Sequence, residues 1–88
     1  MTLKISSHAK RQLKKIERDK ELISRLRKAF DAITDDPYAG KDLGGEMAGI
    51  RSFRAGNWRI LYRVFKERLI VLVISVGDRK EVYRFSEN

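Results

Sequence analysis

The side chains best suited to chemistry on this 88-residue chain are the arginines of its second half. Residues 42–88 hold seven arginines and two lysines, whereas residues 1–41 hold seven lysines and four arginines. A guanidinium presents a rigid, planar fork of donors that matches the oxygens of a phosphate, while lysines on helices mainly keep a surface soluble. We therefore look for phosphate chemistry among Arg51, Arg54, Arg59, Arg63, Arg68, Arg79 and Arg84.

The composition excludes several other kinds of chemistry. The chain has no cysteine, which rules out a disulfide framework, a thiolate zinc site and a cysteine nucleophile. His8 is the single histidine, so no mechanism can use a histidine pair, and no carboxylate cluster suits two-metal chemistry. We expect no metal and no cofactor. A net charge of +8 and a pI near 10.1 indicate a polyanionic or acidic partner.

The sequence lacks the features of a membrane or secreted protein. It has no run of about 18 apolar residues, and its first ten residues lack the apolar segment of a signal peptide. We expect a cytoplasmic protein that does not enter a membrane. The length fits a single domain covering residues 1–88.

The first half of the sequence predicts a short strand followed by two helices. Apolar and polar residues alternate over residues 2–5, which is typical of a strand. Apolar residues then recur at helical spacing from residue 9 to residue 16, and a longer stripe predicts a second helix over roughly residues 19–34. Pro37 ends that helix, because the residue before a proline disfavours helical ψ, and residues 38–47 are predicted to form a loop.

The second half predicts strands. Their predicted ranges are residues 50–54, 58–65, 69–76 and, as a last short strand or extended tail, 81–85. The third is apolar at nearly every position, which suits a strand covered on both faces. The whole predicts an α+β fold of order β-α-α-β-β-β-β, with an antiparallel sheet packed on one face by the N-terminal helical hairpin. Arg59 and Arg63 are expected to project from the face that remains free.

Two segments carry a resemblance to a known family. Residues 49–62 read G-I-R-S-F-R-A-G-N-W-R-I-L-Y, and residues 74–83 read I-S-V-G-D-R-K-E-V-Y. Their order and spacing, with the strand and two helices before them, resemble the RelE/ParE superfamily of type II toxin–antitoxin toxins over essentially the whole chain. The resemblance implies the RelE-like fold of microbial ribonucleases. It favours the RelE branch, whose members cut messenger RNA in the ribosomal A site, over the ParE branch, whose members poison DNA gyrase.

The resemblance also implies which residues act. RelE-type toxins place three residues around the scissile phosphate, and the matching positions here are Arg59, Arg79 and Tyr83. Many relatives carry a histidine where this chain has Asp78, which makes the local field less positive here. Basic residues of the strand before the turn and two further cations are the candidate RNA contacts: Arg51, Arg54, Arg63 and Lys80.

Elementary chemistry suggests a role for each of the three. RNA supplies its own nucleophile, the 2′-hydroxyl, so a catalyst must remove that proton, neutralise charge at phosphorus and stabilise the leaving 5′-oxygen. A tyrosine holds its proton up to about pH 10 unless neighbouring cations favour the phenolate. We hypothesise Tyr83 as general base, Arg59 as the clamp on the phosphate, and Arg79 as the group that stabilises or protonates the leaving oxygen.

A toxin of this family implies macromolecular partners. We expect a cognate antitoxin that forms a toxin–antitoxin hetero-oligomer, together with the ribosome and messenger RNA in the 30S A site. Two alternatives stay open. One is a ParE-like inhibitor of DNA gyrase that performs no chemistry, and the other is a catalytically inactive, RNA-binding relative, which Asp78 motivates.

Overall fold

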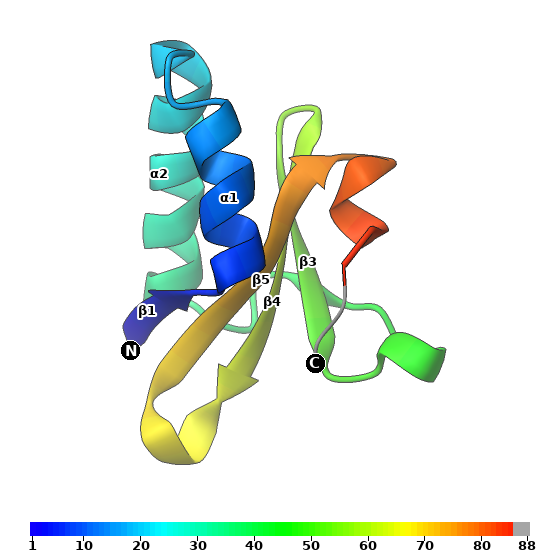
Figure 1. Ribbon diagram of the computed structural model, residues 1–88. Coiled ribbons are helices and arrows are strands. Elements are labelled where there is room, and N and C mark those ends of the chain that lie inside the picture. Colours follow the sequence, from blue (N-terminus) through cyan, green and yellow to red (C-terminus); the bar gives the residue numbers. More distant parts are fainter. Residues whose placement is uncertain (86–88) are drawn as a thin grey trace.

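The computed structural model describes residues 1–85 and arranges them as two helices beside one sheet (Figure 1). The strands are β1 (Thr2–Ile5), β2 (Lys41–Asp42), β3 (Ile50–Ala55), β4 (Trp58–Phe65) and β5 (Ile70–Asp78). The helices are α1 (Ser7–Lys15) and α2 (Lys20–Asp35), and the short 3-10 turns are η1 (Gly45–Met47), η2 (Lys66–Arg68) and η3 (Glu81–Tyr83). The predicted α+β class is confirmed, as is the order of one strand, two helices and then further strands, although β2 was not predicted and residues 81–83 are not a strand.

The sheet has the spatial order β1-β5-β4-β3-β2, with β4 at its centre. The neighbours from β5 to β2 run antiparallel, as predicted, whereas β1 lies parallel to β5. A parallel pair needs a long crossover, which the two helices and the remaining strands supply here. The sheet is therefore mixed at one edge.

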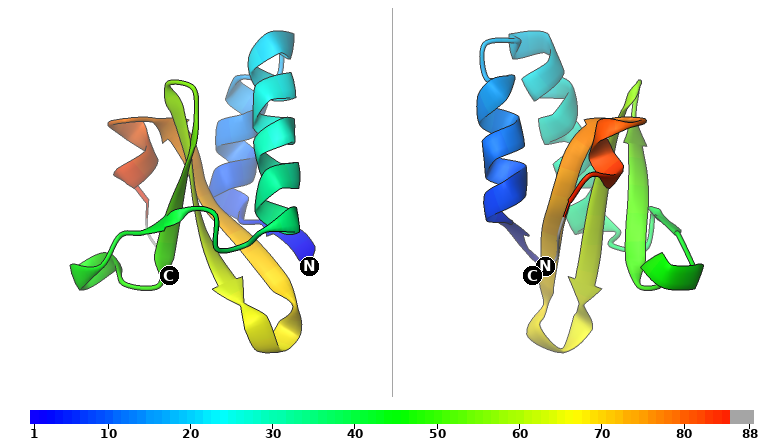
Figure 2. Two further views of the ribbon diagram at one scale, coloured as in Figure 1. Left: turned by 180° about the vertical axis from the view of Figure 1, so that it is seen from behind. Right: turned by 45° about the vertical axis from the view of Figure 1, so that its right-hand side comes forward.

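Both helices pack on one face of the sheet (Figure 2). Ser6 begins α1 by accepting a hydrogen bond from the N–H of Ala9, and Asp19 begins α2 by accepting one from the N–H of Leu22, each at 3.1 Å. The main core joins buried residues of the helices to residues of β3, β4 and β5: Ala9, Leu26, Ala29, Ile33, Ala55, Ile60, Tyr62, Val71, Val73 and Val76. No helix within residues 1–85 is long and apolar enough to cross a bilayer.

The opposite face of the sheet is partly covered, contrary to the expectation of a free face. There η3 folds back over the end of β5, and Val82 is fully buried in a second, smaller apolar cluster. Glu81–Tyr83 therefore form a 3-10 turn rather than the predicted strand or extended tail. Gly77 permits this close approach, because a Cβ atom there would crowd the backbone nitrogen of Val82 at 3.1 Å.

The loop predicted over residues 38–47 contains the two-residue strand β2, which the sequence pattern did not indicate. Tyr62 of β4 fastens the start of this loop to the sheet. Its hydroxyl accepts the N–H of Gly40 at 2.9 Å and donates to the carbonyl of Pro37 at 2.8 Å. Burial raises the pKa of Tyr62 above its ordinary value, so the hydroxyl stays protonated and keeps its donor.

Candidate functional site

The β3–β4 hairpin holds two arginines side by side on the sheet face away from the helices. Arg54 lies directly opposite Arg59 in the strand register, and their strand neighbours Ala55 and Ile60 belong to the helix-side core. The hairpin turns at Gly56, whose φ of +66° lies in the left-handed region that favours glycine. Like charges directly opposite on a sheet repel each other, and an anion bound between them would relieve that repulsion.

A hollow of about 510 Å³ opens beside this arginine pair, between the β3–β4 turn and the end of β5. We call it the turn-side hollow, and its lining residues are Arg54, Gly56, Asn57, Arg59, Asp78, Arg79 and Lys80. Within residues 1–85, the guanidinium groups of Arg54, Arg59 and Arg79 make no hydrogen bond or ion pair. Their donors and charge are therefore available to a ligand, and the chemistry of the lining suits a phosphate.

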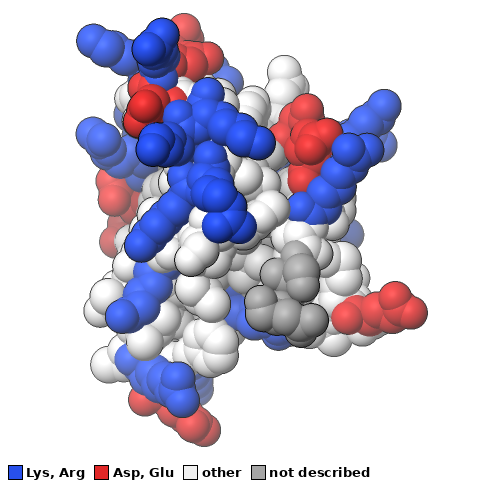
Figure 3. Space-filling view, viewed as in Figure 1, with Lys and Arg blue, Asp and Glu red and all other residues white. Residues whose placement is uncertain are grey.

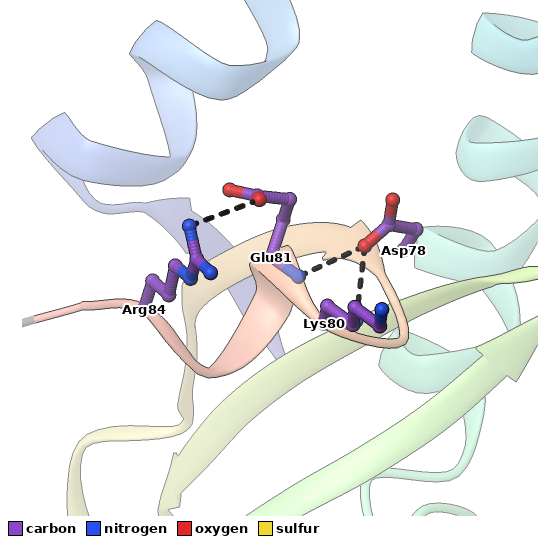
Figure 4. A network of polar contacts seen from close by, with 4 residues as sticks. All are labelled: Asp78, Lys80, Glu81 and Arg84. Carbon is purple, nitrogen blue, oxygen red and sulfur yellow. Dashed lines mark hydrogen bonds and ion pairs between the residues drawn. The ribbon is translucent and has the colours of Figure 1, made fainter.

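Asp78 shapes the loop that carries two of these cations (Figure 4). Its carboxylate accepts hydrogen bonds from the N–H groups of Lys80 at 3.0 Å and Glu81 at 2.8 Å. These bonds hold the pKa of Asp78 below its ordinary value, so the group stays ionised. An ion pair of 3.3 Å between Glu81 and Arg84 follows on η3. Asp78 is thus a residue that fixes the loop.

A second hollow of about 340 Å³ shares the arginine pair and extends toward the edge of the sheet. We call it the β2-side hollow, and its lining residues are Lys41, Asp42, Leu43, Ser52, Arg54 and Arg59. Because Arg54 and Arg59 line both hollows, the two hollows adjoin at this arginine pair, and we refer to them together as the groove.

Tyr83 lies on η3, next to the groove but outside its lining. The residue before Tyr83, Val82, packs against Gly77 of β5. Gly77 in turn lies directly opposite Arg59 in the strand register, so the backbone of Tyr83 is close to the strand position that carries Arg59. The Tyr83 side chain is 39% exposed and is not among the residues that line either hollow. The structure thus brings Arg59 and Arg79 into one hollow, with Tyr83 on the adjoining turn.

The candidate RNA contacts divide into two groups. Arg54 and Lys80 line the turn-side hollow, whereas Arg51 and Arg63 line neither hollow. The Arg51 guanidinium lies over the Tyr38 ring at 4.8 Å and donates hydrogen bonds to the carbonyl groups of residues 38 and 40. Arg63 lies four residues along β4 from Arg59, and its guanidinium reaches Gly49.

Sequence reasoning did not identify Lys41 and Asn57 as site residues. Asn57 follows Gly56 in the hairpin turn and lines the turn-side hollow. A place in a turn does not by itself indicate that a side chain lines a hollow. Lys41 belongs to a strand too short to show alternation, so nothing in the sequence put it on the same face as Arg54.

Comparisons with known proteins agree with this architecture over nearly the whole chain. A family model described as the ParE toxin of type II toxin–antitoxin systems, parDE, matches residues 3–83. The chain is 33% identical over 84 residues to Toxin RelG of Mycobacterium tuberculosis, a match that covers 94% of this chain and 95% of that protein.

Solved structures give the same result. The M. tuberculosis toxin–antitoxin complex RelBE2 matches with a TM-score of 0.78 at 33% identity, covering 89% of this chain and 96% of that one. The isolated Escherichia coli RelE toxin matches with a TM-score of 0.72 at 26% identity, covering 93% of this chain and 89% of that one. Family model, sequence relative and fold agree, and the chain therefore belongs to the ParE toxin family, within the RelE/ParE superfamily of type II toxin–antitoxin toxins.

Proposed function

We propose that this toxin is an endoribonuclease that cleaves messenger RNA on the ribosome and so inhibits translation. The observation that carries the proposal is the set of guanidinium groups of Arg54, Arg59 and Arg79 around one hollow, which have no partner among residues 1–85. A phosphodiester passing through a pentacoordinate state gains negative charge on its oxygens, and preorganised donors around that point stabilise it. The relative RelG and the isolated RelE structure support a RelE-like activity by likeness.

The proposed roles of the arginines follow from their positions around the turn-side hollow, and the role of Tyr83 follows from the family resemblance. The RNA 2′-oxygen attacks phosphorus and the bond to the 5′-oxygen breaks, which leaves a 2′,3′-cyclic phosphate and a 5′-hydroxyl. Arg54 and Arg59 hold the non-bridging oxygens, and Arg79 stabilises the charge that develops on the leaving 5′-oxygen, which takes its proton from water. Tyr83, on the adjoining turn η3, serves as the general base that takes the proton of the 2′-hydroxyl.

Dependence on the ribosome follows from the weakness of this acid–base set. The one histidine of the chain is on α1, which packs on the other side of the sheet, so no imidazole serves the groove. A site that relies on tyrosine and arginine gains most from a substrate held in the attacking geometry, because alignment removes much of the entropic part of the barrier. The ribosome with its bound message supplies such alignment.

The toxin is proposed to act together with a cognate antitoxin in a toxin–antitoxin complex. The RelBE2 structure, at 33% identity, contains such a complex. A net charge of +8 on this chain favours a partner with a surplus of acidic residues, which would cover the groove by charge complementarity.

A second candidate function is a ParE-like toxin that inhibits DNA gyrase by binding. The match of the ParE family model to residues 3–83 favours it. Such an inhibitor needs no phosphate clamp, so loss of Arg79 would leave its toxicity intact.

Primer extension on translated messages after induction of the toxin distinguishes the two candidates. We expect codon-phased cuts with the native protein and with Arg27→Ala, which alters an exposed arginine of α2, and few or none with Arg79→Ala. Gyrase-linked DNA breaks without message cleavage would overturn the nuclease proposal and support the ParE-like candidate.

A further inference from the structure

The groove continues beyond the phosphate clamp, and its second part has the composition of a nucleotide-binding site. The β2-side hollow is lined by Arg54 and Arg59 of the arginine pair and also by Lys41 of β2. Its volume of about 340 Å³ is at the lower end of the range for pockets that hold small molecules. The hollow is thus large enough for one nucleoside beside the phosphate that the arginine pair would hold.

Strand register decides which side chains face this hollow. Lys41 lies opposite Ser52, and Ser52 lies opposite Leu61, whose side chain belongs to the cluster on the face away from the helices. Side chains alternate along a strand, so Lys41 shares that face. Asp42 also lines the hollow, and its carboxylate accepts a backbone N–H. Leu43 packs against the same cluster. Besides the arginine pair, the hollow therefore combines one ammonium group, one hydroxyl, one apolar side chain and the carboxylate of Asp42, which is engaged with the backbone.

The spacing of the cations suits successive phosphates of one strand. Adjacent strands are about 4.8 Å apart and residues rise about 3.4 Å along a strand, so the Cα atoms of Lys41 and Arg54 are offset by roughly 8 Å. Phosphates along one strand of a stacked duplex are about 3.4 Å apart along the axis, and an extended single strand separates them further. One extended nucleotide together with the long, flexible Lys41 side chain can therefore bridge this offset.

Lys41 has no competing partner in the described part of the protein. Its ammonium group makes no ion pair or hydrogen bond within residues 1–85, and the residue is exposed. Asp42, its neighbour, uses its carboxylate to accept the N–H of Gly44 at 2.8 Å, which fixes the backbone just after β2. The lysine is therefore held on a fixed edge of the sheet with its charge unpaired.

We propose that Lys41 binds the phosphate adjacent to the scissile one, and that Leu43 and Ser52 hold the nucleoside between the two phosphates. The proposal rests on the proposed function, because it takes the arginine pair as the site of the scissile phosphate. It makes Lys41 a binding residue that fixes the register of single-stranded RNA along the groove, so that one phosphodiester at a time lies on Arg54 and Arg59.

The test uses short 2′-O-methyl RNA, which has no free 2′-hydroxyl and cannot be cleaved. The probes are a dinucleotide with one internal phosphate and the same dinucleotide with an added phosphate at its 5′ end or at its 3′ end. Binding to the isotope-labelled protein is followed by NMR titration at low salt. The variants are Lys41→Ala and, as matched control, Lys28→Ala, which removes an exposed lysine of α2.

We expect one of the two added phosphates to tighten binding about threefold to tenfold in the native protein and in Lys28→Ala. In Lys41→Ala that gain disappears, while the plain dinucleotide binds as before. A gain that survives in Lys41→Ala, or no gain from either end, overturns the proposal for Lys41. If instead no probe shifts the signals of Arg54 and Arg59, the phosphate clamp itself fails, and with it both this proposal and the proposed function.

Discussion

At the scale of single residues, the main feature is the contrast between arginines that have protein partners and arginines that do not. Arg51 is used for structure, because its guanidinium is hydrogen-bonded to two carbonyl groups and lies over an aromatic ring. Arg54, Arg59 and Arg79 have no such partners within residues 1–85. Unpaired cations gathered around one hollow repel one another, so this arrangement favours a bound polyanion over the empty protein.

Tyr83→Phe tests the base assignment at this scale. Phenylalanine keeps the ring and removes the hydroxyl, and the residue is already partly exposed, so the fold should be unaffected. We expect the rate of message cleavage to fall by about 10²–10⁴-fold, as is usual when a general base is lost. The measurement is single-turnover cleavage of ribosome-bound message, with Tyr38→Phe, another exposed tyrosine, as control. Cleavage at the native rate would assign the base role elsewhere.

Asp78→Asn tests the loop that carries Arg79 and Lys80. Because the folded protein holds the pKa of Asp78 below its ordinary value, the carboxylate stabilises the fold above the unfolded-state pKa of about 3.9. That contribution is lost as pH falls through the lower, folded-state pKa. The melting temperature of the native protein should therefore exceed that of Asp78→Asn at pH 6, and the difference between the two should close below about pH 3.9. An equal difference at every pH would disprove the linkage.

At the scale of elements, α1 does more than cover the core, since it also completes the hydrogen bonding of β5. The strand β1 ends at Ile5, and the edge of β5 beyond that point is satisfied by side chains. The Ser6 hydroxyl donates to the carbonyl of Ile74, and Gln12 accepts the N–H of Val76 at 2.7 Å. The end of β5, which leads into the loop with Arg79, is thus held by the helix layer.

Gln12→Leu tests this support. Leucine keeps the apolar stem but leaves the Val76 N–H without its acceptor, which should cost about 1–3 kcal/mol of unfolding free energy. Denaturant unfolding measures the loss, and hydrogen exchange at the Val76 amide should become faster. Lys10→Leu, at an exposed position of the same helix, is the control. Unchanged exchange at Val76 in Gln12→Leu would show that another group satisfies this amide.

The elements that could be predicted from sequence are those whose signal is periodic and local. Both helices and the strands β3, β4 and β5 follow from apolar spacing, with ends within a few residues of those observed. The turn η3 could not be predicted, because it depends on a contact between Val82 and Gly77 and on the Asp78 carboxylate, both set by tertiary geometry. Two residues of β2 are likewise too few to show a period.

The candidate site could be predicted from sequence only in part, because some of its residues are brought together by tertiary geometry. Arg59 and Arg79 follow from the resemblance, and both line the turn-side hollow. On sequence grounds, Arg51 and Arg54 are both predicted to be RNA contacts. Residues three apart on a strand point to opposite faces of the sheet, so strand alternation by itself places these two side chains on different faces. Lys41 entered the groove only through the register of β2 with β3. Whether Tyr83 acts with the two arginines stays a prediction.

At the scale of the whole molecule, positive charge lies on both sides of the sheet. Lysine and arginine side chains gather over α1, on the side opposite the groove (Figure 3). Together with the net charge of +8, this distribution favours the approach of a polyanion from several directions. Figure 3 also shows acidic side chains beside basic ones on the side of the molecule where η3 lies.

The central claim is that the arginine pair in the groove stabilises the phosphate while RNA is cut. The most direct measurement is the single-turnover rate at which purified protein cleaves ribosome-bound message, compared between Arg59→Ala and Arg27→Ala. Arg59→Ala removes one preorganised donor, so we predict a rate about 10²–10³-fold below the native protein, with Arg27→Ala unchanged. An Arg59→Ala protein that is folded, binds the ribosome and cuts message at the native rate would contradict the account.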